Sequence, residues 1–256
     1  ELGGVSWEMV LRLRMAEAKT WKNMLNSLSA LVDEVCITAD EEGLKVKAMD
    51  PSHVSMVDFE WSRGAFDEYE VDKPTTIGLN IKEVLKLLRR ISGESMELSF
   101  DESTGRLEMK LIGRYTRRFT VSTLQLTGEE IPPLRVEFDV SAKVTSSCLE
   151  RTVVDAATVS DILKFKATED VFVMEASGEL GDVTVELDRT SEALLDLQVR
   201  QPSEASYSLT FLEDIVKSAS DLAGTVSVEF STDKPLKLNF DVLQGKLIYY
   251  IAPYVE

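Results

Sequence analysis

A chain of 256 residues with 44% hydrophobic residues is long enough to bury one large core or two ordinary ones. Its 45 acidic and 28 basic residues give a formal net charge of −17, which taken alone argues against nucleic acid as a ligand. No apolar run approaches the roughly 20 residues that a membrane-spanning helix needs, and the first residues lack the blocks of a signal peptide. We therefore expect an intracellular globular protein with no membrane partner.

Four stretches of the chain predict amphipathic helices that share one apolar register. In each, the residues at i, i+3, i+4, i+7 and i+10 are apolar almost throughout, which is one face of a helix with 3.6 residues per turn. The four registers begin at Trp21, Ile81, Leu149 and Leu212. Capping-box spacing, in which Glu follows Asn, Ser or Thr by three residues, predicts three of the helix starts, at Asn80, Ser147 and Thr210.

Short alternating segments surround every predicted helix, and most show the period of two that is typical of half-buried antiparallel strands. One strand is expected before each helix, at residues 9–15, 76–79, 136–140 and 207–209. Three are expected after it, at 35–39, 44–49 and 55–61; 96–100, 107–111 and 115–121; 162–167, 171–176 and 183–187; and 225–230, 236–240 and 247–251. The pattern predicts a β-α-β-β-β unit repeated four times, which is an α+β fold.

Residues 122–135 interrupt this repeat between the second and third units. The segment contains Pro132 and Pro133, which oppose helix formation and favour an extended chain. We interpret it as a connector between two similar domains, each made of two units. The predicted domains are residues 1–121, of which 1–8 form an extension, and residues 136–256.

Residues that commonly serve catalysis or metal binding are sparse. His53 is the single histidine, and the two cysteines, Cys36 and Cys148, lie far apart in apolar surroundings. This pattern argues against a zinc site and favours two buried free thiols, as in a reducing compartment. No nucleophile–base arrangement, phosphate-binding loop or dinucleotide fingerprint is apparent. The sequence therefore predicts a protein that is not an enzyme and that binds no metal or cofactor.

Cations gather on the polar sides of the predicted helices in spite of the acidic composition. The second helix carries four of them against the single acid Glu83, whereas the charges of the third and fourth helices alone are ordinary solvation. A phosphate responds mainly to charges within about 8 Å at physiological salt, so a local cationic stripe can attract DNA on an acidic chain. The pattern favours a phosphate-facing surface. The cations are Lys19, Lys22, Lys82, Lys86, Arg89, Arg90, Arg151 and Lys217.

Four stretches make the chain resemble a sliding clamp of the proliferating cell nuclear antigen family. They are Ala-Met-Asp-Pro-Ser-His-Val-Ser-Met at 48–56, Thr-Ile-Gly-Leu-Asn at 76–80, Lys-Pro-Leu at 234–236 and Leu-Ile-Tyr-Tyr-Ile-Ala-Pro at 247–253. The resemblance runs from Met9 to Glu256. It implies a ring of three subunits in which the helices line a central hole and antiparallel sheets form the outside. Duplex DNA would pass through the hole and be bound without regard to sequence, while the ring tethers DNA polymerase.

The resemblance also assigns residues. The eight cations above would face DNA phosphates. The partner-peptide pocket would comprise Met49, His53, Met56, Leu126, Ile131, Pro235, Tyr250, Ile251, Ala252 and Pro253. Several relatives have an aliphatic residue near the position of Glu129, so Leu124 or Leu126 would replace that contact here. Subunits would join through residues 111–119 and 177–185, with charges at Arg114, Arg117, Arg118, Glu179 and Asp182.

The resemblance implies DNA polymerase, clamp loader, flap endonuclease and DNA ligase as partners, each bound through short peptides with hydrophobic and aromatic anchors. Thr168 and Glu169 stand where eukaryotic relatives carry a modified lysine, which favours an archaeal source. The protein would then work in the cytoplasm or nucleoid, or in the nucleus of a eukaryote. Three alternatives to a homotrimer stay open: a subunit of a heterotrimeric clamp, a checkpoint-type clamp, and a peptide-binding scaffold that never encircles DNA.

Overall fold

The computed structural model describes residues 9–127 and 131–255. Within them the chain forms four α-helices, one short 3-10 helix and 18 strands, which confirms the predicted α+β class. Residues 1–8, predicted as an extension, and Glu129 in the connector lie outside the described residues. The helices are α1 (Ala18–Ser29), α2 (Ile81–Leu87), α3 (Ser146–Ala157) and α4 (Leu209–Ser220), with the 3-10 helix η1 at Arg63–Ala65.

The strands repeat in the two halves of the chain. Those of the N-terminal half are β1 (Met9–Met15), β2 (Glu34–Asp40), β3 (Gly43–Met49), β4 (Ser55–Ser62), β5 (Glu68–Val71), β6 (Thr75–Asn80), β7 (Ser95–Asp101), β8 (Arg106–Ile112) and β9 (Thr116–Ser122). Those of the C-terminal half are β10 (Val140–Thr145), β11 (Ile162–Ala167), β12 (Val171–Gly178), β13 (Gly181–Asp188), β14 (Leu194–Val199), β15 (Ser203–Ser208), β16 (Thr225–Phe230), β17 (Leu236–Phe240) and β18 (Gly245–Ile251).

The strands form three sheets, and every pairing between described strands is antiparallel. A five-stranded sheet has the order β5-β1-β7-β8-β9, and a four-stranded sheet has the order β13-β12-β11-β15. The third sheet, β14-β10-β16-β17-β18-β4-β3-β2-β6, contains strands from both halves. Its two halves meet where β18 pairs with β4 over seven residue pairs, from Gly245 with Trp61 to Ile251 with Ser55.

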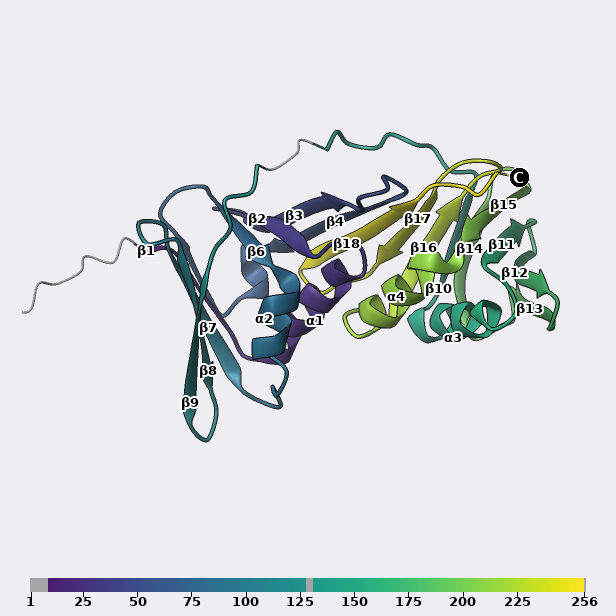
Figure 1. Cartoon of the computed structure of the whole chain (residues 1–256). Coiled ribbons are helices and arrows are strands. Elements are labelled where there is room, and N and C mark those ends of the chain that lie inside the picture. Colours follow the sequence, from purple (N-terminus) through teal and green to yellow (C-terminus); the bar gives the residue numbers. More distant parts are fainter. Residues whose placement is uncertain (1–8, 128–130, 256) are drawn as a thin grey trace, which may run out of the picture.

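The four helices lie on one side of the molecule, in the spatial order α2, α1, α4 and α3 (Figure 1). Helix α1 contacts both α2 and α4, and α4 contacts α3. The apolar register predicted for each helix is its buried face, because Trp21, Ile81, Leu149 and Leu212 are all nearly inaccessible to solvent. The polar side of every helix therefore faces away from the core, which is what a functional helical surface requires.

The predicted strand at residues 136–140 is wrong in position. Residues 131–138 have no regular secondary structure, and β10 begins only at Val140. Val140 pairs with Val199 of β14 on one side and with Phe230 of β16 on the other, so it is the first residue with neighbours on both sides. The short strands β5 and β14, absent from the prediction, pair with β1 and β10 and so add one strand to the first and third units.

The helix caps correct two predicted helix starts. Asn80 caps α2 as predicted, because its side-chain oxygen accepts a hydrogen bond from the backbone N–H of Glu83 at 3.0 Å. Helix α3 is capped by Thr145 and α4 by Ser208, so the predicted cap residues Ser147 and Thr210 lie inside the helices. Thr145 and Ser208 end the preceding strands and keep an extended backbone, which is the conformation that a capping residue needs.

Replacing Thr145 with alanine is expected to lower the free energy of unfolding by about 1 kcal/mol, because α3 loses its side-chain cap at the N–H of Cys148. The same change at Ser147, which the sequence also offers as a cap, is the matched control and should change stability by less than about 0.5 kcal/mol. Urea unfolding of both variants measures the difference. Equal losses would show that Thr145 does not stabilise α3 in this way.

Cys36 and Cys148 are both unpaired with another cysteine, as predicted. They are half-buried rather than buried, which corrects the sequence-based expectation. Partial burial still raises the pKa of each thiol, and this favours the unreactive protonated form at neutral pH.

Candidate functional site

Seven of the eight predicted cations of the helical side fall into two groups, and the eighth, Lys22, is half-buried and bonded to the loop after α2. Lys19, Lys86, Arg89, Arg90 and Arg151 are exposed, and none of them forms an ion pair with another described residue. Lys82 is bound to Asp33 at 2.8 Å, and Lys217 to Glu213 at 2.6 Å, which raises the pKa of Lys217. Only the first group is available to an incoming anion without breaking an existing pair.

The positive charge is concentrated on the helices of the N-terminal half. Helix α1 carries two cations and no acid, and residues 81–90 carry four cations and one acid. Helices α3 and α4 each carry one cation and two acids. Because exposed charges act over about 8 Å at physiological salt, an anionic polymer along this side would be attracted mainly by α1 and α2.

The loop after α2, which carries Arg89 and Arg90, is held by side chains from two other elements. Lys22 of α1 donates a hydrogen bond from Nζ to the carbonyl oxygen of Arg89 at 3.4 Å. Arg117 of β9 donates to the carbonyl oxygen of Arg90 at 3.0 Å and pairs with the carboxylate of Glu94. Cations at the C-terminal end of a helix also interact favourably with the negative end of the helix dipole. Arg117 therefore fixes the cationic loop.

The strands that carry the predicted peptide pocket lie side by side in the middle of the nine-stranded sheet, in the order β18-β4-β3. Met49 of β3 pairs with Met56 of β4, and Met56 pairs with Tyr250 of β18. Residues on either side of each, such as Ala48, Val57 and Tyr249, turn to the core, so the three predicted residues share the outward face. Met56 is only 5% exposed although it lies outside the main hydrophobic core.

The other predicted pocket residues divide by their place in the fold. Pro235 and Ala252 are half-buried beside this cluster: Pro235 precedes β17, and Ala252 donates from its N–H to the carbonyl oxygen of Val54 at 2.9 Å. Ile251 is 1% exposed and belongs to the core, so its side chain is structural. His53 is exposed, whereas Pro253 and Ile131 are half-buried. Leu126 lies away from the cluster, next to Cys36 of β2.

Asp50 organises the loop between β3 and β4, which carries His53. Its carboxylate accepts hydrogen bonds from the N–H groups of Ser52, Val54 and Ser55 at 2.8, 2.8 and 2.5 Å, and from the hydroxyl of Ser52. Burial alone would raise the pKa of Asp50, but these hydrogen bonds outweigh it and lower the pKa below its usual value. The loop thus depends on an ionised, buried carboxylate.

Asp50→Ala is expected to lower the free energy of unfolding at pH 7 by about 2 kcal/mol, because one buried and two partly buried N–H groups lose their acceptor. A depressed folded-state pKa gives a contribution that is complete above the ordinary aspartate pKa of about 3.9 and is lost as the pH falls through the folded-state pKa. Denaturant unfolding between pH 7 and pH 3 should therefore show the deficit shrinking at low pH. Glu70→Ala, on an exposed side chain, is the control, and a pH-independent deficit would contradict this role of the carboxylate.

The connector is anchored at the edge of β6. The N–H of Leu124 donates to the carbonyl oxygen of Gly78 at 2.8 Å, and the two residues form an isolated antiparallel bridge. The thiol of Cys36 lies 3.9 Å from the carbonyl oxygen of Leu126. A Cβ atom at Gly78 would overlap the carbonyl oxygen of Leu124, so only glycine permits this close approach. Residues 131–135 of the connector lie on the side of the nine-stranded sheet opposite the helices (Figure 1).

The predicted subunit contacts lie at two sheet edges. Strand β9 ends the five-stranded sheet, and β13 ends the four-stranded sheet. Arg114, Arg118, Glu179 and Asp182 are exposed at these edges, together with Tyr115, 71% exposed, and Leu180, 85% exposed, at the hairpin tips. Arg117 differs from the other predicted residues, since it faces the helical side and is occupied by Glu94. Exposed edges that bear apolar tips are places where a second chain can pair.

Metal-binding clusters and membrane-spanning helices are both absent from the described residues. Between residues 9–127 and 131–255, no group of three or more His, Cys, Asp or Glu side chains is placed to hold a metal ion. No helix in the same ranges is long and apolar enough to cross a membrane.

Comparison with known proteins gives the family. Residues 10–131 match the N-terminal domain of proliferating cell nuclear antigen, and residues 131–255 match its C-terminal domain. The chain belongs to the proliferating cell nuclear antigen family. Membership agrees with the resemblance in the sequence and with the arrangement of four helices on one side of antiparallel sheets.

Relatives in the proliferating cell nuclear antigen family match along almost their entire length. DNA polymerase sliding clamp 1 of Pyrobaculum aerophilum is 37% identical over 246 residues, covering 95% of this chain and 98% of that protein. The DNA polymerase sliding clamp of Pyrococcus furiosus is 31% identical over 240 residues, covering 93% and 96%. The crystal structure of the family member from Thermococcus kodakaraensis superposes with a TM-score of 0.89, at 28% identity over 95% of this chain and 100% of that one. These relatives are archaeal, like the predicted source.

Three structural features of the candidate site are absent from the sequence-based prediction. Gly78 anchors the connector, Asp50 organises the loop between β3 and β4, and Arg117 holds the loop after α2. The role of Asp50 had a local sequence signal, because Asp followed by Pro and Ser is typical of a turn in which the aspartate side chain accepts hydrogen bonds from the backbone. Gly78 and Arg117 had none, since their partners lie 46 and 27 residues away along the chain.

Proposed function

We propose that this chain is a sliding clamp that encircles duplex DNA as a ring of three subunits and tethers DNA polymerase to its template. The observation that carries the proposal is the row of four helices on one side, with unpaired cations on α1 and α2 and sheets behind them. Relatives named DNA polymerase sliding clamp, matched over more than 90% of both chains, support it. The protein supplies no catalytic group to this task and acts by enclosing DNA inside the cell.

The cations would meet phosphates rather than base edges, so binding is independent of sequence and weakens steeply with salt. Lys86, Arg89, Arg90, Lys19 and Arg151 are the primary contacts, because no described side chain forms an ion pair with them. Lys22, Lys82 and Lys217 contribute after exchanging an existing partner for phosphate. Loose contacts of this kind allow the ring to slide, while the ring stays on DNA because it encloses the duplex.

Partner peptides would dock on the outward face between the connector and the C-terminal strand β18. Met49, Met56 and Tyr250 form the apolar floor, and methionine side chains adapt to different anchors. DNA polymerase, clamp loader, flap endonuclease and DNA ligase are the proposed partners, each presenting one short segment with aliphatic and aromatic side chains. In this proposal residues 1–121 and 136–256 are the two domains, and residues 122–135 are the connector that borders the pocket.

Retention on circular DNA tests the proposal. The chain is assembled on a nicked circular plasmid with a clamp loader and ATP, and half of the sample is then cut once by a restriction enzyme. A closed ring stays on circular DNA but slides off the ends of the linear product. Gel filtration at moderate salt separates DNA-bound protein from free protein. Equal retention on both forms would reject encirclement and favour a peptide-binding scaffold.

Light scattering on the same preparation separates the ring types. A mass of three times the 28.6 kDa chain indicates self-assembly. A monomer or dimer that reaches the ring size only with other chains would indicate a heterotrimeric or checkpoint-type clamp.

A further inference from the structure

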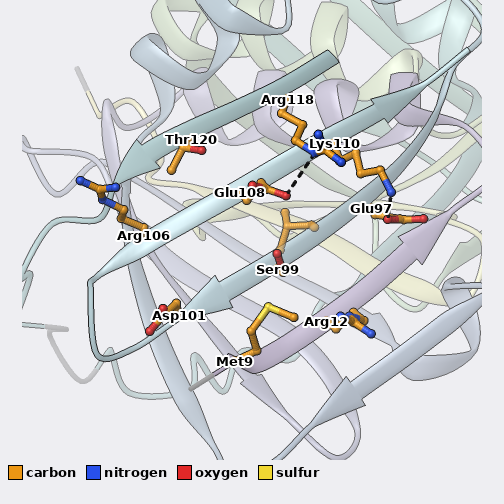
Figure 2. A pocket seen from close by; sticks show the side chains of 11 residues that line it. Met9, Arg12, Glu97, Ser99, Asp101, Arg106, Glu108, Lys110, Arg118 and Thr120 are labelled. Carbon is orange, nitrogen blue, oxygen red and sulfur yellow. Dashed lines mark hydrogen bonds and ion pairs between the residues drawn. The ribbon is translucent and has the colours of Figure 1, made fainter. Parts of the chain in front are cut away.

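Two cavities on the surface differ in the side chains that line them. One, of about 430 Å³, opens on the five-stranded sheet, and Figure 2 shows charged side chains around it. Several of these charges already pair with one another, since Lys110 lies 2.8 Å from Glu97 and Arg118 lies 4.0 Å from Glu108. The other, of about 400 Å³, is lined by apolar side chains and carboxylates, with no cation among the lining residues. The second cavity therefore offers an apolar surface and charge of a single sign.

Both halves of the chain contribute to this second cavity. Trp61 of β4, Ala65 of η1 and the segment between β1 and α1 come from the N-terminal half. Leu222, in the loop after α4, and Val242, in the loop after β17, come from the C-terminal half. Ligand pockets occur preferentially where two domains meet, because the surfaces there are concave without loss of core packing.

The cavity lies at the opposite end of β18 from the predicted peptide pocket. Gly245 pairs with Trp61 at the cavity end of the β18–β4 pair, and Ile251 pairs with Ser55 at the pocket end. Six residue steps of about 3.3 Å each place the two ends about 20 Å apart. None of the residues that line the cavity belongs to the predicted pocket or to the segments 111–119 and 177–185 predicted to join subunits. Peptide binding and ring closure, as predicted, therefore both leave the cavity free.

Leu243 lines this cavity and is 84% exposed in the turn between β17 and β18. The next residue, Gln244, has a φ of +56°, which residues other than glycine rarely adopt. Its carbonyl oxygen accepts a hydrogen bond from the N–H of Ser62 at 2.9 Å, and the N–H of Gly245 donates to the carbonyl oxygen of Val242 at 3.2 Å. The turn is thus held in a conformation that keeps a leucine in water beside an apolar cavity, where a partner can cover it.

Two carboxylates, Glu17 and Asp67, line the cavity together with the apolar side chains. Both are exposed, and neither forms an ion pair with a residue in the ranges 9–127 and 131–255. The cations close to them in sequence, Arg14, Lys19 and Arg63, are not among the residues that line the cavity. A cationic group that enters beside an apolar anchor would give both carboxylates a partner, whereas a phosphate or an acidic segment would be repelled.

We propose that this cavity binds a short segment of a second protein in which an aliphatic or aromatic side chain stands next to lysine or arginine. The apolar side chain packs against Leu243 and Leu222, and the basic group pairs with Glu17 or Asp67. The inference goes beyond the proposed clamp function, because it gives the chain a protein-binding site that is separate from the predicted peptide pocket and able to act at the same time.

Peptide selection with a counter-selection tests this site. A phage library of random twelve-residue peptides is first passed over the variant E17K/D67K, which removes peptides that bind elsewhere, and is then selected on the wild-type protein. We expect the recovered peptides to be rich in an apolar residue next to lysine or arginine. Synthetic copies should bind the wild type at least tenfold more tightly than E17K/D67K, as isothermal titration calorimetry would measure.

Two further variants separate the apolar contribution from the charged one. Leu243→Ser removes the exposed apolar side chain, leaves both carboxylates in place, and should weaken binding at least fivefold. E192K/E204K makes the same charge change at two exposed acids outside the cavity and should leave the affinity unchanged. Circular dichroism verifies folding of every variant. An empty pool after the counter-selection, recovered peptides without basic residues, or undiminished affinity in Leu243→Ser would overturn the proposal.

The proposed clamp function is tested separately from this site. The cavity is present on a single chain, so peptide binding can be measured whether or not the wild type is retained on circular DNA. The variant E17K/D67K should in turn form the same assembly as the wild type, because neither residue lies in the predicted junction segments.

Discussion

Reversing two unpaired cations of residues 81–90, in K86E/R89E, is expected to weaken the binding of the ring to DNA phosphates, because every subunit loses charge at its most positive surface. Both side chains lie on the segment that carries four cations against one acid, and neither forms an ion pair with another described residue. Each lost phosphate contact removes about 0.9 from the slope of log affinity against log salt. The double variant should therefore lose about 1.8 per subunit that contacts DNA, with further loss from repulsion by the new carboxylates.

The measurement is DNA affinity of the assembled ring between 50 and 200 mM salt, together with polymerase processivity. Lys164→Glu, on β11 in the outer sheets, makes the same kind of charge change away from the helices and should leave both quantities unchanged. Lys217→Glu should reduce DNA affinity less than Lys86→Glu or Arg89→Glu alone, because Lys217 is already bound to Glu213. An unaltered salt slope in K86E/R89E, with the trimer intact, would refute the assignment of α2 to phosphate contact.

Gly78→Ala is expected to weaken the binding of partner peptides at least tenfold without unfolding either domain. The new methyl group would occupy the position of the Leu124 carbonyl oxygen, so the connector must leave the edge of β6 and lose its hydrogen bond to Gly78. Overpacking of this kind costs about 1–3 kcal/mol where the neighbours cannot move, and here the connector can move away instead. The substitution is therefore expected to reduce peptide affinity at the border of the pocket and to leave the packing of the core intact.

Fluorescence anisotropy with a labelled peptide that has one aliphatic and two aromatic anchors measures this effect. Gly224→Ala is the matched control, because a Cβ atom there meets no other atom within 4 Å. The melting temperature should fall only slightly in both variants. Undiminished peptide affinity in Gly78→Ala would show that anchoring of the connector at β6 does not shape the pocket.

These two experiments probe features of different origin. The cationic stripe of α2 is visible in the sequence, because Lys82, Lys86 and Arg89 share one helix face by spacing alone. The anchor at Gly78 is not visible, since a glycine in an alternating strand has many explanations until its partner Leu124 is placed beside it. Local periodicity is encoded over a few residues, whereas contacts between distant segments depend on the packed fold.

The helix caps show the same division at short range. Both Thr145 and Ser147 precede the apolar register of α3, and the capping-box spacing favours Ser147. The structure selects Thr145, because β10 ends there and leaves its backbone extended. The limits of a strand depend on tertiary contacts, because Val140 and the residues after it form a strand only by pairing with β14 and β16 on either side.

The sequence by itself determined the four amphipathic helices, most of the strands, the α+β class and the concentration of cations on α2, since each follows from hydrophobic period or from charge spacing within about ten residues. Its motifs also pointed to the proliferating cell nuclear antigen family. Only the tertiary structure decided that β18 joins β4 across the two halves, that Arg117 holds the loop after α2, and that β9 and β13 each end a sheet. Those outcomes depend on which strands pair and on which face each side chain emerges, and both are set by the packed core rather than by neighbours in the chain.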